Sequence, residues 1–171
     1  MSKDMESLKA ALEPVFAELP IGILVNNVGI SYEYAMYLTE LSEDRLKTII
    51  HLNCEVTAMV TKMCVGGMVE RRRGAIINIA SAAGIMACGN PLYDLYSASK
   101  AFVNFFSLSL ATELKEKNIV VEVCSESYDI LLYYYIIIGI IVHFLHVVPL
   151  PLLRPLKTKQ DSQGFPVLSS C

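Results

Sequence analysis

Three short apolar runs alternate with longer amphipathic stretches along the first 124 residues. The runs are residues 23–25, 75–79 and 119–123, and each has the length of a buried strand. Between them, apolar residues recur three or four positions apart, which is typical of helices that bury one face. Strands that alternate with helices predict a parallel sheet in an α/β fold.

Three helices are predicted around these strands. Residues 2–16 are charged and helical in period, without the apolar core of a signal peptide. A second helix begins at Ser42, an N-cap residue followed by Glu43 and Asp44, and runs toward Met68. We expect it to bury a stripe that consists of Leu46, Ile49, Ile50, Asn53, Val56, Val60 and Met63.

Two glycines and three arginines are expected to mark the end of this second helix. Gly66 and Gly67 predict a helix end rather than a phosphate-binding turn. The run 71–73 is three arginines, and we interpret it as a solvated helix end rather than a binding patch. The third helix is predicted from about residue 92 to residue 117.

The third helix carries a tyrosine and a lysine four residues apart. Tyr96 and Lys100 therefore share one face, where an ammonium can lower the pKa of a phenol and make it a proton donor and acceptor. A tyrosine and a lysine at this spacing also occur on helices where neither residue has a catalytic role. The preceding strand ends near Ser81, at the edge where open α/β sheets place ligands, and this context favours chemistry.

Four motifs in this order resemble the short-chain dehydrogenase/reductase family. They are Asn26-Asn27-Val28-Gly29 after a strand, Asn53 in a helix, Ser81, and Tyr96 with Lys100. Residues 24–34, 67–71 and 96–103 resemble the branch of 17β-hydroxysteroid dehydrogenases and very-long-chain 3-oxoacyl-CoA reductases. The resemblance covers roughly residues 1–123.

The resemblance implies a fold and a reaction. Residues 1–124 would form a partial Rossmann-like, doubly wound parallel sheet whose first three strands are missing. The reaction would be hydride transfer between a nicotinamide cofactor, NADP(H) rather than NAD(H), and a ketone or secondary alcohol. The substrate class would be lipid-like, a steroid or a 3-oxoacyl-CoA.

The resemblance also implies a role for each site residue. Tyr96 would exchange the proton, Ser81 would hold the substrate oxygen, and Lys100 would activate Tyr96 and bind the ribose. For two further sets of residues, the sequence leaves open whether they have the function known in the family or only a structural role. Asn53 would hold a relay water or is a satisfied buried amide. Asn26, Asn27 and Gly29 would steady the sheet and line the adenosine side of the cofactor, or form an ordinary turn.

The chain departs from the family pattern in two places. The glycine-rich turn that seats the cofactor pyrophosphate is absent, so we expect these 171 residues alone to be inactive. The alternative function is a membrane-associated or partner-binding chain without a cofactor. The loop 85–95, which lies between Ser81 and Tyr96, is about two residues longer than the corresponding loop of the family. We expect the longer loop to change the shape of this region more than the chemistry of the site.

The last 47 residues do not follow the family. Residues 125–153 include an uncharged run long enough to span a bilayer, after which 154–171 is expected to be disordered. The run is a membrane anchor, which would place the protein on the cytosolic side of the endoplasmic reticulum, or read-through past an exon boundary. We favour read-through; a chain without an anchor would be cytoplasmic.

The composition limits which partners and metal ions we expect the protein to bind. A net charge of −3 argues against nucleic acid. The five cysteines and three histidines show no metal-ligand spacing, so no metal is expected. The third helix carries Ala101, Phe105, Leu108 and Ala111 on its other side. In the family the outer face of this helix packs against a second copy, so a homodimer is one expectation; the alternative is that this amphipathic face is part of the core.

Overall fold

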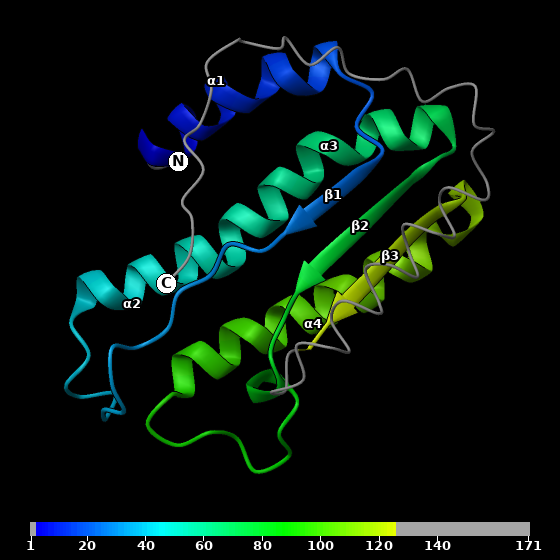
Figure 1. Cartoon of the computed structure of the whole chain (residues 1–171). Helices are drawn as coiled ribbons and strands as arrows, with labels where there is room; N and C mark the ends of the chain where they lie inside the picture. Colours follow the sequence, from blue (N-terminus) through cyan, green and yellow to red (C-terminus); the bar gives the residue numbers. More distant parts are fainter. Residues whose placement is uncertain (1–2, 126–171) are drawn as a thin grey trace, which may run out of the picture. The chain divides into compact units, whose positions relative to one another are not determined.

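The computed structural model describes residues 3–125, which contain a three-stranded parallel sheet (Figure 1). The strand order is β1-β2-β3, with β1 at Ile23–Asn26, β2 at Gly74–Ile79 and β3 at Ile119–Cys124. Asn26 lies opposite Asn78, and Ile79 lies opposite Cys124. The predicted α/β fold with a parallel sheet is confirmed. Apart from Ser125, the predicted apolar segment and tail lie outside the described residues.

Helices connect the strands, as the sequence predicts. The long elements are α1 (Lys3–Glu18), α2 (Glu43–Ile50), the π-helical η1 (His51–Val56), α3 (Thr57–Arg71) and α4 (Asp94–Leu114). Two short 3₁₀ turns, η2 (Ala82–Gly84) and η3 (Lys115–Lys117), flank α4. Ser42 caps α2, because its Oγ accepts the Arg45 N–H at 3.3 Å. α3 ends at Arg71, and Arg72 takes the left-handed conformation that closes it.

Two local predictions about the second helix are wrong. Gly66 and Gly67 lie inside α3, because the fully buried Met68 holds the last turn of the helix against the sheet and outweighs a glycine cost of about 1 kcal/mol each. Ile50 is 44% exposed. Neighbouring helical residues point about 100° apart, and Ile49, which is fully buried, takes the core position.

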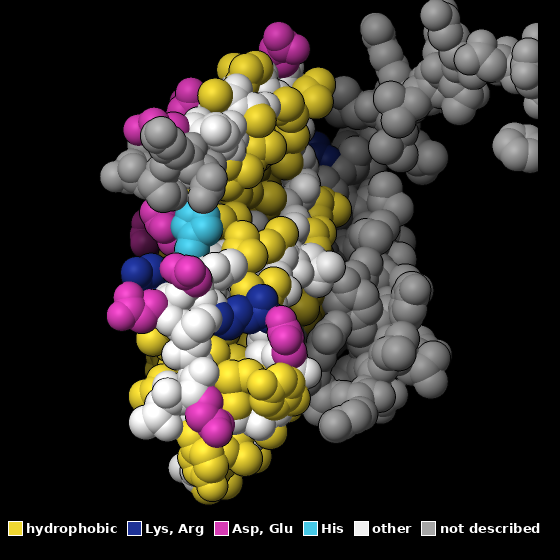
Figure 2. Space-filling view, turned by 90° about the vertical axis from the view of Figure 1, so that its left-hand side faces the viewer, with side chains coloured by type: hydrophobic (Ala, Val, Ile, Leu, Met, Phe, Trp, Pro, Cys, Tyr) yellow, Lys and Arg dark blue, Asp and Glu magenta, His cyan; other side chains and the backbone are white. Residues whose placement is uncertain are grey.

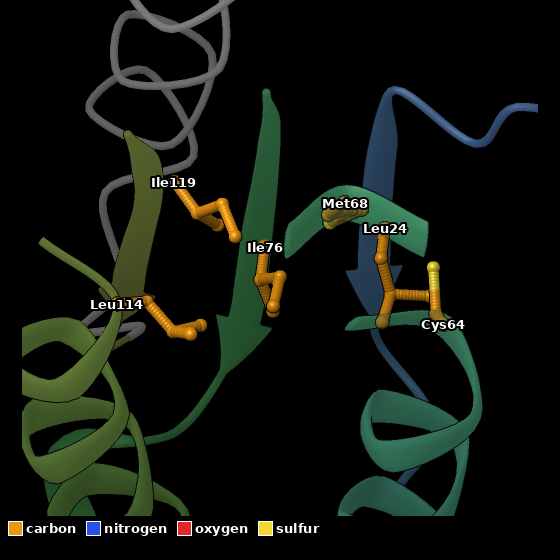
Figure 3. Packing of buried hydrophobic residues seen from close by; sticks show 6 residues of the cluster. All are labelled: Leu24, Cys64, Met68, Ile76, Leu114 and Ile119. Atoms are coloured by element: carbon orange, nitrogen blue, oxygen red, sulfur yellow. The ribbon is translucent and has the colours of Figure 1, made fainter. Parts of the chain in front are cut away.

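The core lies between the sheet and two helices. Leu24, Ile76 and Ile119 come from the three strands and meet Cys64 and Met68 of α3 and Leu114 of α4 (Figure 3). The described α3 and α4 therefore pack on the same face of the sheet. The central strand β2 is buried along its whole length, which explains why its sequence is apolar apart from Asn78. The core fixes the ends of β1 and β2 beside the first turns of α4.

Charge and hydropathy add two observations. Figure 2 shows acidic and basic side chains interspersed with hydrophobic ones on the face turned to the viewer, without a broad basic area among the coloured residues. Between residues 3 and 125, no helix combines the length and the apolar character needed to cross a bilayer.

Candidate active site

The Tyr96–Lys100 pair lies where α4 passes the end of β2. The Lys100 Nζ lies 5.9 Å from the centroid of the Tyr96 ring, and it donates to the carbonyl of Ile79 at 2.9 Å. Lys100 is only 6% exposed. An ammonium held in this way cannot swing into solvent, so its charge stays beside the phenol. The structure thus brings together the two residues that the helical spacing predicts.

Gly29 lies beside both this ammonium and the Asn53 side chain. A Cβ placed on Gly29 would lie 3.2 Å from the Lys100 Nζ and 3.5 Å from the Asn53 Oδ1. A side chain at position 29 would therefore crowd the ammonium, since 3.2 Å is tighter than ordinary packing, whereas the 3.5 Å approach to Asn53 is an ordinary contact. Three elements meet here: the loop after β1, the π-helical η1, and α4.

Asn53 ties the loop after β1 to α4. Its amide accepts the Ile30 N–H at 2.8 Å and donates to the Ile30 carbonyl at 2.9 Å. The second amide hydrogen is donated to the Ser99 Oγ at 2.8 Å, and Ser99 donates to the Tyr96 carbonyl at 2.7 Å. Both amide hydrogens are used, which is how a buried structural amide is satisfied. The Oδ1, which accepts the Ile30 N–H, has the capacity to accept a second hydrogen bond.

Ser81 opens the turn that rests on α4. It caps η2, and its Oγ accepts the Ala83 N–H at 3.2 Å. A Cβ on Gly84, the last residue of this turn, would lie 2.5 Å from the Lys100 carbonyl carbon and 2.6 Å from the Ala101 nitrogen. This contact places the turn that Ser81 opens beside the α4 backbone at the level of Lys100.

Asn26 and Asn27 lie apart from this cluster and differ from each other. The Asn26 Nδ2 donates to the Thr61 Oγ1 at 2.8 Å and to the Asn78 Oδ1 at 2.7 Å. Asn78 in turn donates to the Ser107 Oγ at 2.8 Å. This polar network joins β1, β2, α3 and α4 under the sheet. Asn27, in contrast, is exposed.

Tyr32 and Asp94 are site residues that sequence reasoning misses. The Tyr32 hydroxyl donates to the Asp94 Oδ1 at 2.6 Å, and the Leu95 N–H donates to both groups, at 3.2 and 2.7 Å. Burial raises the pKa of Tyr32, and the hydrogen bond to Asp94 adds to the effect. The only sequence signals are a tyrosine-rich loop and an aspartate at a helix start. Through these hydrogen bonds, Tyr32 and Asp94 connect the loop after β1 to the turn that carries Tyr96.

The cluster fits one end of a nicotinamide cofactor. Tyr96, Lys100 and Gly29 form a corner with a buried ammonium and no side chain at position 29. Between residues 3 and 125, no strand leads through a glycine-rich turn into a helix N-terminus, so a pyrophosphate cradle is not among the described elements. No three or more His, Cys, Asp or Glu side chains of the described part gather closely enough to hold a metal.

Comparison with known proteins places this geometry in a family. The family described as short chain dehydrogenase matches residues 1–128. The chain belongs to this family. It is 47% identical over 106 residues to a very-long-chain 3-oxoacyl-CoA reductase of Mus musculus, which covers 61% of this chain and 33% of that protein. With the Homo sapiens protein of the same name it shares 40% identity over 119 residues, 68% of this chain and 38% of the relative.

Solved structures of the family share its fold. The closed form of serine dehydrogenase complexed with NADP+ is 36% identical with a TM-score of 0.62, over 67% of this chain and 47% of that one. A metagenomic short-chain oxidoreductase in complex with NADP is 25% identical with a TM-score of 0.65, over 71% and 54%. The chain spans about a third of the length of the curated relatives it matches.

Proposed function

We propose that this protein is an NAD(P)-dependent oxidoreductase that interconverts a ketone and a secondary alcohol. The observation that carries the proposal is the buried Lys100 ammonium, bonded to the Ile79 carbonyl and set beside the Tyr96 ring. A fixed cation next to a phenol stabilises negative charge on the phenol oxygen. A general acid and base needs this property, because it must give up and regain a proton during each turnover.

Each residue of the cluster has one task in this proposal. Tyr96 gives its proton to the substrate oxygen during reduction and takes it back during oxidation. Ser81 holds the same oxygen through its hydroxyl, and Lys100 stabilises the phenolate. The nicotinamide, when bound, supplies or accepts the hydride. Lys100 and Tyr96 would hold its ribose, and the missing side chain at Gly29 leaves room beside them.

Asn53 and Asn26 support the site from behind. Asn53 fixes the loop that carries Gly29 and, through Ser99, the backbone of Tyr96. Its unused lone pair is where a relay water would bind. Asn26 holds the sheet together, and we propose that the Asn27–Gly29 turn lines the adenosine side of the cofactor. The sheet would be one half of a doubly wound Rossmann sheet.

The substrate is proposed to be a lipid-like 3-oxoacyl-CoA or steroid, with NADP(H) as cofactor rather than NAD(H). The names of the relatives in Mus musculus and Homo sapiens support the acyl-CoA. Two solved neighbours that contain NADP support the cofactor.

A titration with NADPH tests the proposal on the 171-residue chain. The missing glycine-rich turn predicts that these 171 residues alone are inactive, whereas a site that is complete enough for the proposed reaction should bind NADPH saturably in the micromolar range, followed through the cofactor fluorescence. The alternative function is a family member that acts through a membrane or a protein partner and binds no cofactor. Failure of the fluorescence to saturate would favour this alternative.

The substitution Tyr96→Phe tests the proton transfer separately. It removes the phenol oxygen but keeps the ring beside Lys100, so cofactor binding should stay within about twofold while turnover of a 3-oxoacyl-CoA falls at least ~100-fold. Tyr93→Phe is the matched control, because Tyr93 has no lysine four residues later and stacks on Tyr32 instead. Turnover retained by Tyr96→Phe would remove Tyr96 from its role.

A further inference from the structure

The loop after β1 and the first turn of α4 carry different parts of the proposed site. Gly29, in this loop, lies beside the Lys100 ammonium, and Tyr96 lies in the first turn of α4. A hydride and a proton reach the same carbonyl group only if the nicotinamide and the phenol are held at a suitable separation. The contacts between the loop and the helix therefore determine how well the site is aligned.

Tyr32 contacts the first turn of α4 through its hydroxyl. The hydroxyl donates to the Asp94 Oδ1 at 2.6 Å and accepts the Leu95 N–H at 3.2 Å. The Leu95 N–H also donates to the Asp94 Oδ1, at 2.7 Å. Leu95 is the second residue of α4, where a backbone N–H has no partner within the helix. The exchange of this amide with water therefore reports on the contact between Tyr32 and Asp94.

The ring of Tyr32 adds a second contact to the same region. Tyr32 is 7% exposed, and its ring stacks on that of Tyr93 with the centroids 5.5 Å apart. Tyr32 also belongs to a buried cluster with Leu41 and Ile49, and Tyr96 packs against this cluster. Because close packing leaves the Tyr32 ring little room to move, its hydroxyl holds the start of α4 in one place.

The backbone of Tyr96 is supported on both sides. On its carboxyl side, Asn53 donates to the Ser99 Oγ, and Ser99 donates to the Tyr96 carbonyl. On its amino side, the hydrogen bond from Tyr32 to Asp94 joins the helix to the loop after β1. Without this hydrogen bond, the amino side would lose a contact with the loop, and the first turn of α4 could tilt.

We propose that Tyr32 and Asp94 are positioning residues that set the place of Tyr96 relative to Gly29. Tyr32 is three residues from Gly29, and Asp94 is two residues from Tyr96, so their hydrogen bond joins the loop and the helix close to both. The pair itself would contact neither the substrate nor the cofactor. Its effect on the rate rests on the proposed reductase function, because a reacting group displaced by about 1 Å can lower a rate about 100-fold.

Backbone amide signals of the full chain labelled with ¹⁵N test the positioning without any turnover. Tyr32→Phe should shift the signal of Tyr96, and Asp94→Ala should shift the signal of Gly29, although each substitution lies in the other segment. Exchange of the Leu95 amide with water should become at least about fivefold faster in both variants. Folded Tyr32→Phe and Asp94→Ala chains that show neither shift would overturn the proposal.

Two further variants separate this hydrogen bond from an unspecific effect of substitution. Asp94 is exposed, and Asp94→Asn keeps an oxygen that can accept from the Tyr32 hydroxyl, so it should leave the Gly29 signal close to its original place. Tyr34→Phe is the matched control, because Tyr34 lies in the same loop and is 66% exposed, and it should not shift the signal of Tyr96. Equal shifts of Tyr96 in Tyr34→Phe and Tyr32→Phe would contradict the positioning role.

Steady-state kinetics of the same chains with NADPH and a 3-oxoacyl-CoA extend the test to the reaction. In Tyr32→Phe and in Asp94→Ala, kcat should fall about tenfold while KM stays within about twofold, because the substrate contacts are unchanged. The double variant should also lose about tenfold rather than about 100-fold, because both changes remove the same hydrogen bond. An unchanged kcat in these variants would overturn the positioning role and leave the reductase function intact. Amide shifts between the two segments in a chain that turns over no substrate would support the positioning and overturn the reductase function alone.

Discussion

Asn78 occupies the centre of the polar network beneath the sheet. It accepts a hydrogen bond from Asn26 at 2.7 Å and donates one to Ser107 at 2.8 Å, and it is completely buried. A polar group in such a place costs free energy unless every partner is present. The pairing of β1 with β2 therefore depends on the side-chain amides of Asn26 and Asn78.

Replacing Asn78 with alanine should destabilise the fold. The change removes two buried hydrogen bonds and leaves the Asn26 amide with Thr61 as its remaining partner. We expect the free energy of unfolding to fall by about 2 kcal/mol, measured by urea denaturation. Asn27→Ala is the control, because exposed Asn27 should change it by less than about 0.5 kcal/mol. Equal effects of the two substitutions would contradict this role for the network.

Tyr32 should make stability depend on alkaline pH. Its pKa in the folded protein is raised above 10.0, chiefly by burial. Below pH 10 both states keep the phenol protonated, so its stabilising contribution is complete. Above pH 10 the unfolded state loses the proton first, so stability falls as pH rises toward the folded pKa.

The variant Tyr32→Phe isolates this contribution. At pH 7 it should cost about 1.5 kcal/mol, because a hydrogen bond to a carboxylate is lost. Between pH 10 and pH 11, the stability of the original chain should decline more steeply than that of the variant in urea titrations. Tyr37→Phe, at an exposed tyrosine, serves as the control. Identical pH slopes for the original chain and Tyr32→Phe would show that Tyr32 does not titrate differently on unfolding.

Periodicity predicts that two residues lie together only when they are close in the sequence. Tyr96 and Lys100 are four residues apart in one helix, so their spacing predicts their shared face. Tyr32 and Asp94 are 62 positions apart, and no periodicity connects them. Asn53 is intermediate: a resemblance singles it out, but only the structure shows that it bonds Ile30 and Ser99.

At the scale of elements, apolar periodicity predicts the existence of the helices but not their interior detail. The apolar pattern predicts the second helix as one element, whereas α2 and α3 are joined by the π-helical η1. A π turn inserts an additional residue, and such turns recur at functional sites. Here the turn carries Asn53. Glycine is a poor guide to helix ends where a buried neighbour such as Met68 fixes the last turn.

Substitution by alanine should change the free energy of unfolding in opposite directions at two glycines, Gly84 of η2 and Gly66 of α3. A Cβ on Gly84 would lie 2.5 Å from backbone atoms of α4, whereas one on Gly66 would meet nothing within 4 Å. Gly84→Ala should therefore push η2 off the helix and lower the free energy of unfolding by at least about 2 kcal/mol. Gly66→Ala should raise it by about 0.5–1 kcal/mol, because alanine restricts the unfolded chain.

Urea denaturation of both glycine variants checks the pair. The same samples also report on function, because Gly84 holds the turn that Ser81 opens. Gly84→Ala should lower turnover even under conditions in which it remains folded, and Gly66→Ala should leave turnover unchanged. A stable, fully active Gly84→Ala chain would show that the turn does not need to rest on α4.

On the scale of the whole molecule, the outer face of α4 is apolar and exposed. Phe105 is 71% exposed and Leu108 is 56% exposed, and Phe102 stacks on Phe106 beside them. The sequence predicted this apolar face but could not say what covers it, because periodicity does not distinguish a core from an interface. Large clusters of exposed apolar side chains are rare on monomeric proteins, and such a cluster marks a surface that contacts another molecule.

Phe105→Glu tests whether this face joins two copies of the chain. A charge at the centre of an apolar interface must be desolvated without a partner, so association should weaken by at least about 100-fold. Sedimentation velocity of the full chain should show a dimer that becomes a monomer in the variant. Leu19→Glu is the matched control: Leu19 is 55% exposed, follows α1, and should leave the dimer intact. If both variants sediment like the original chain, the α4 face is not the interface.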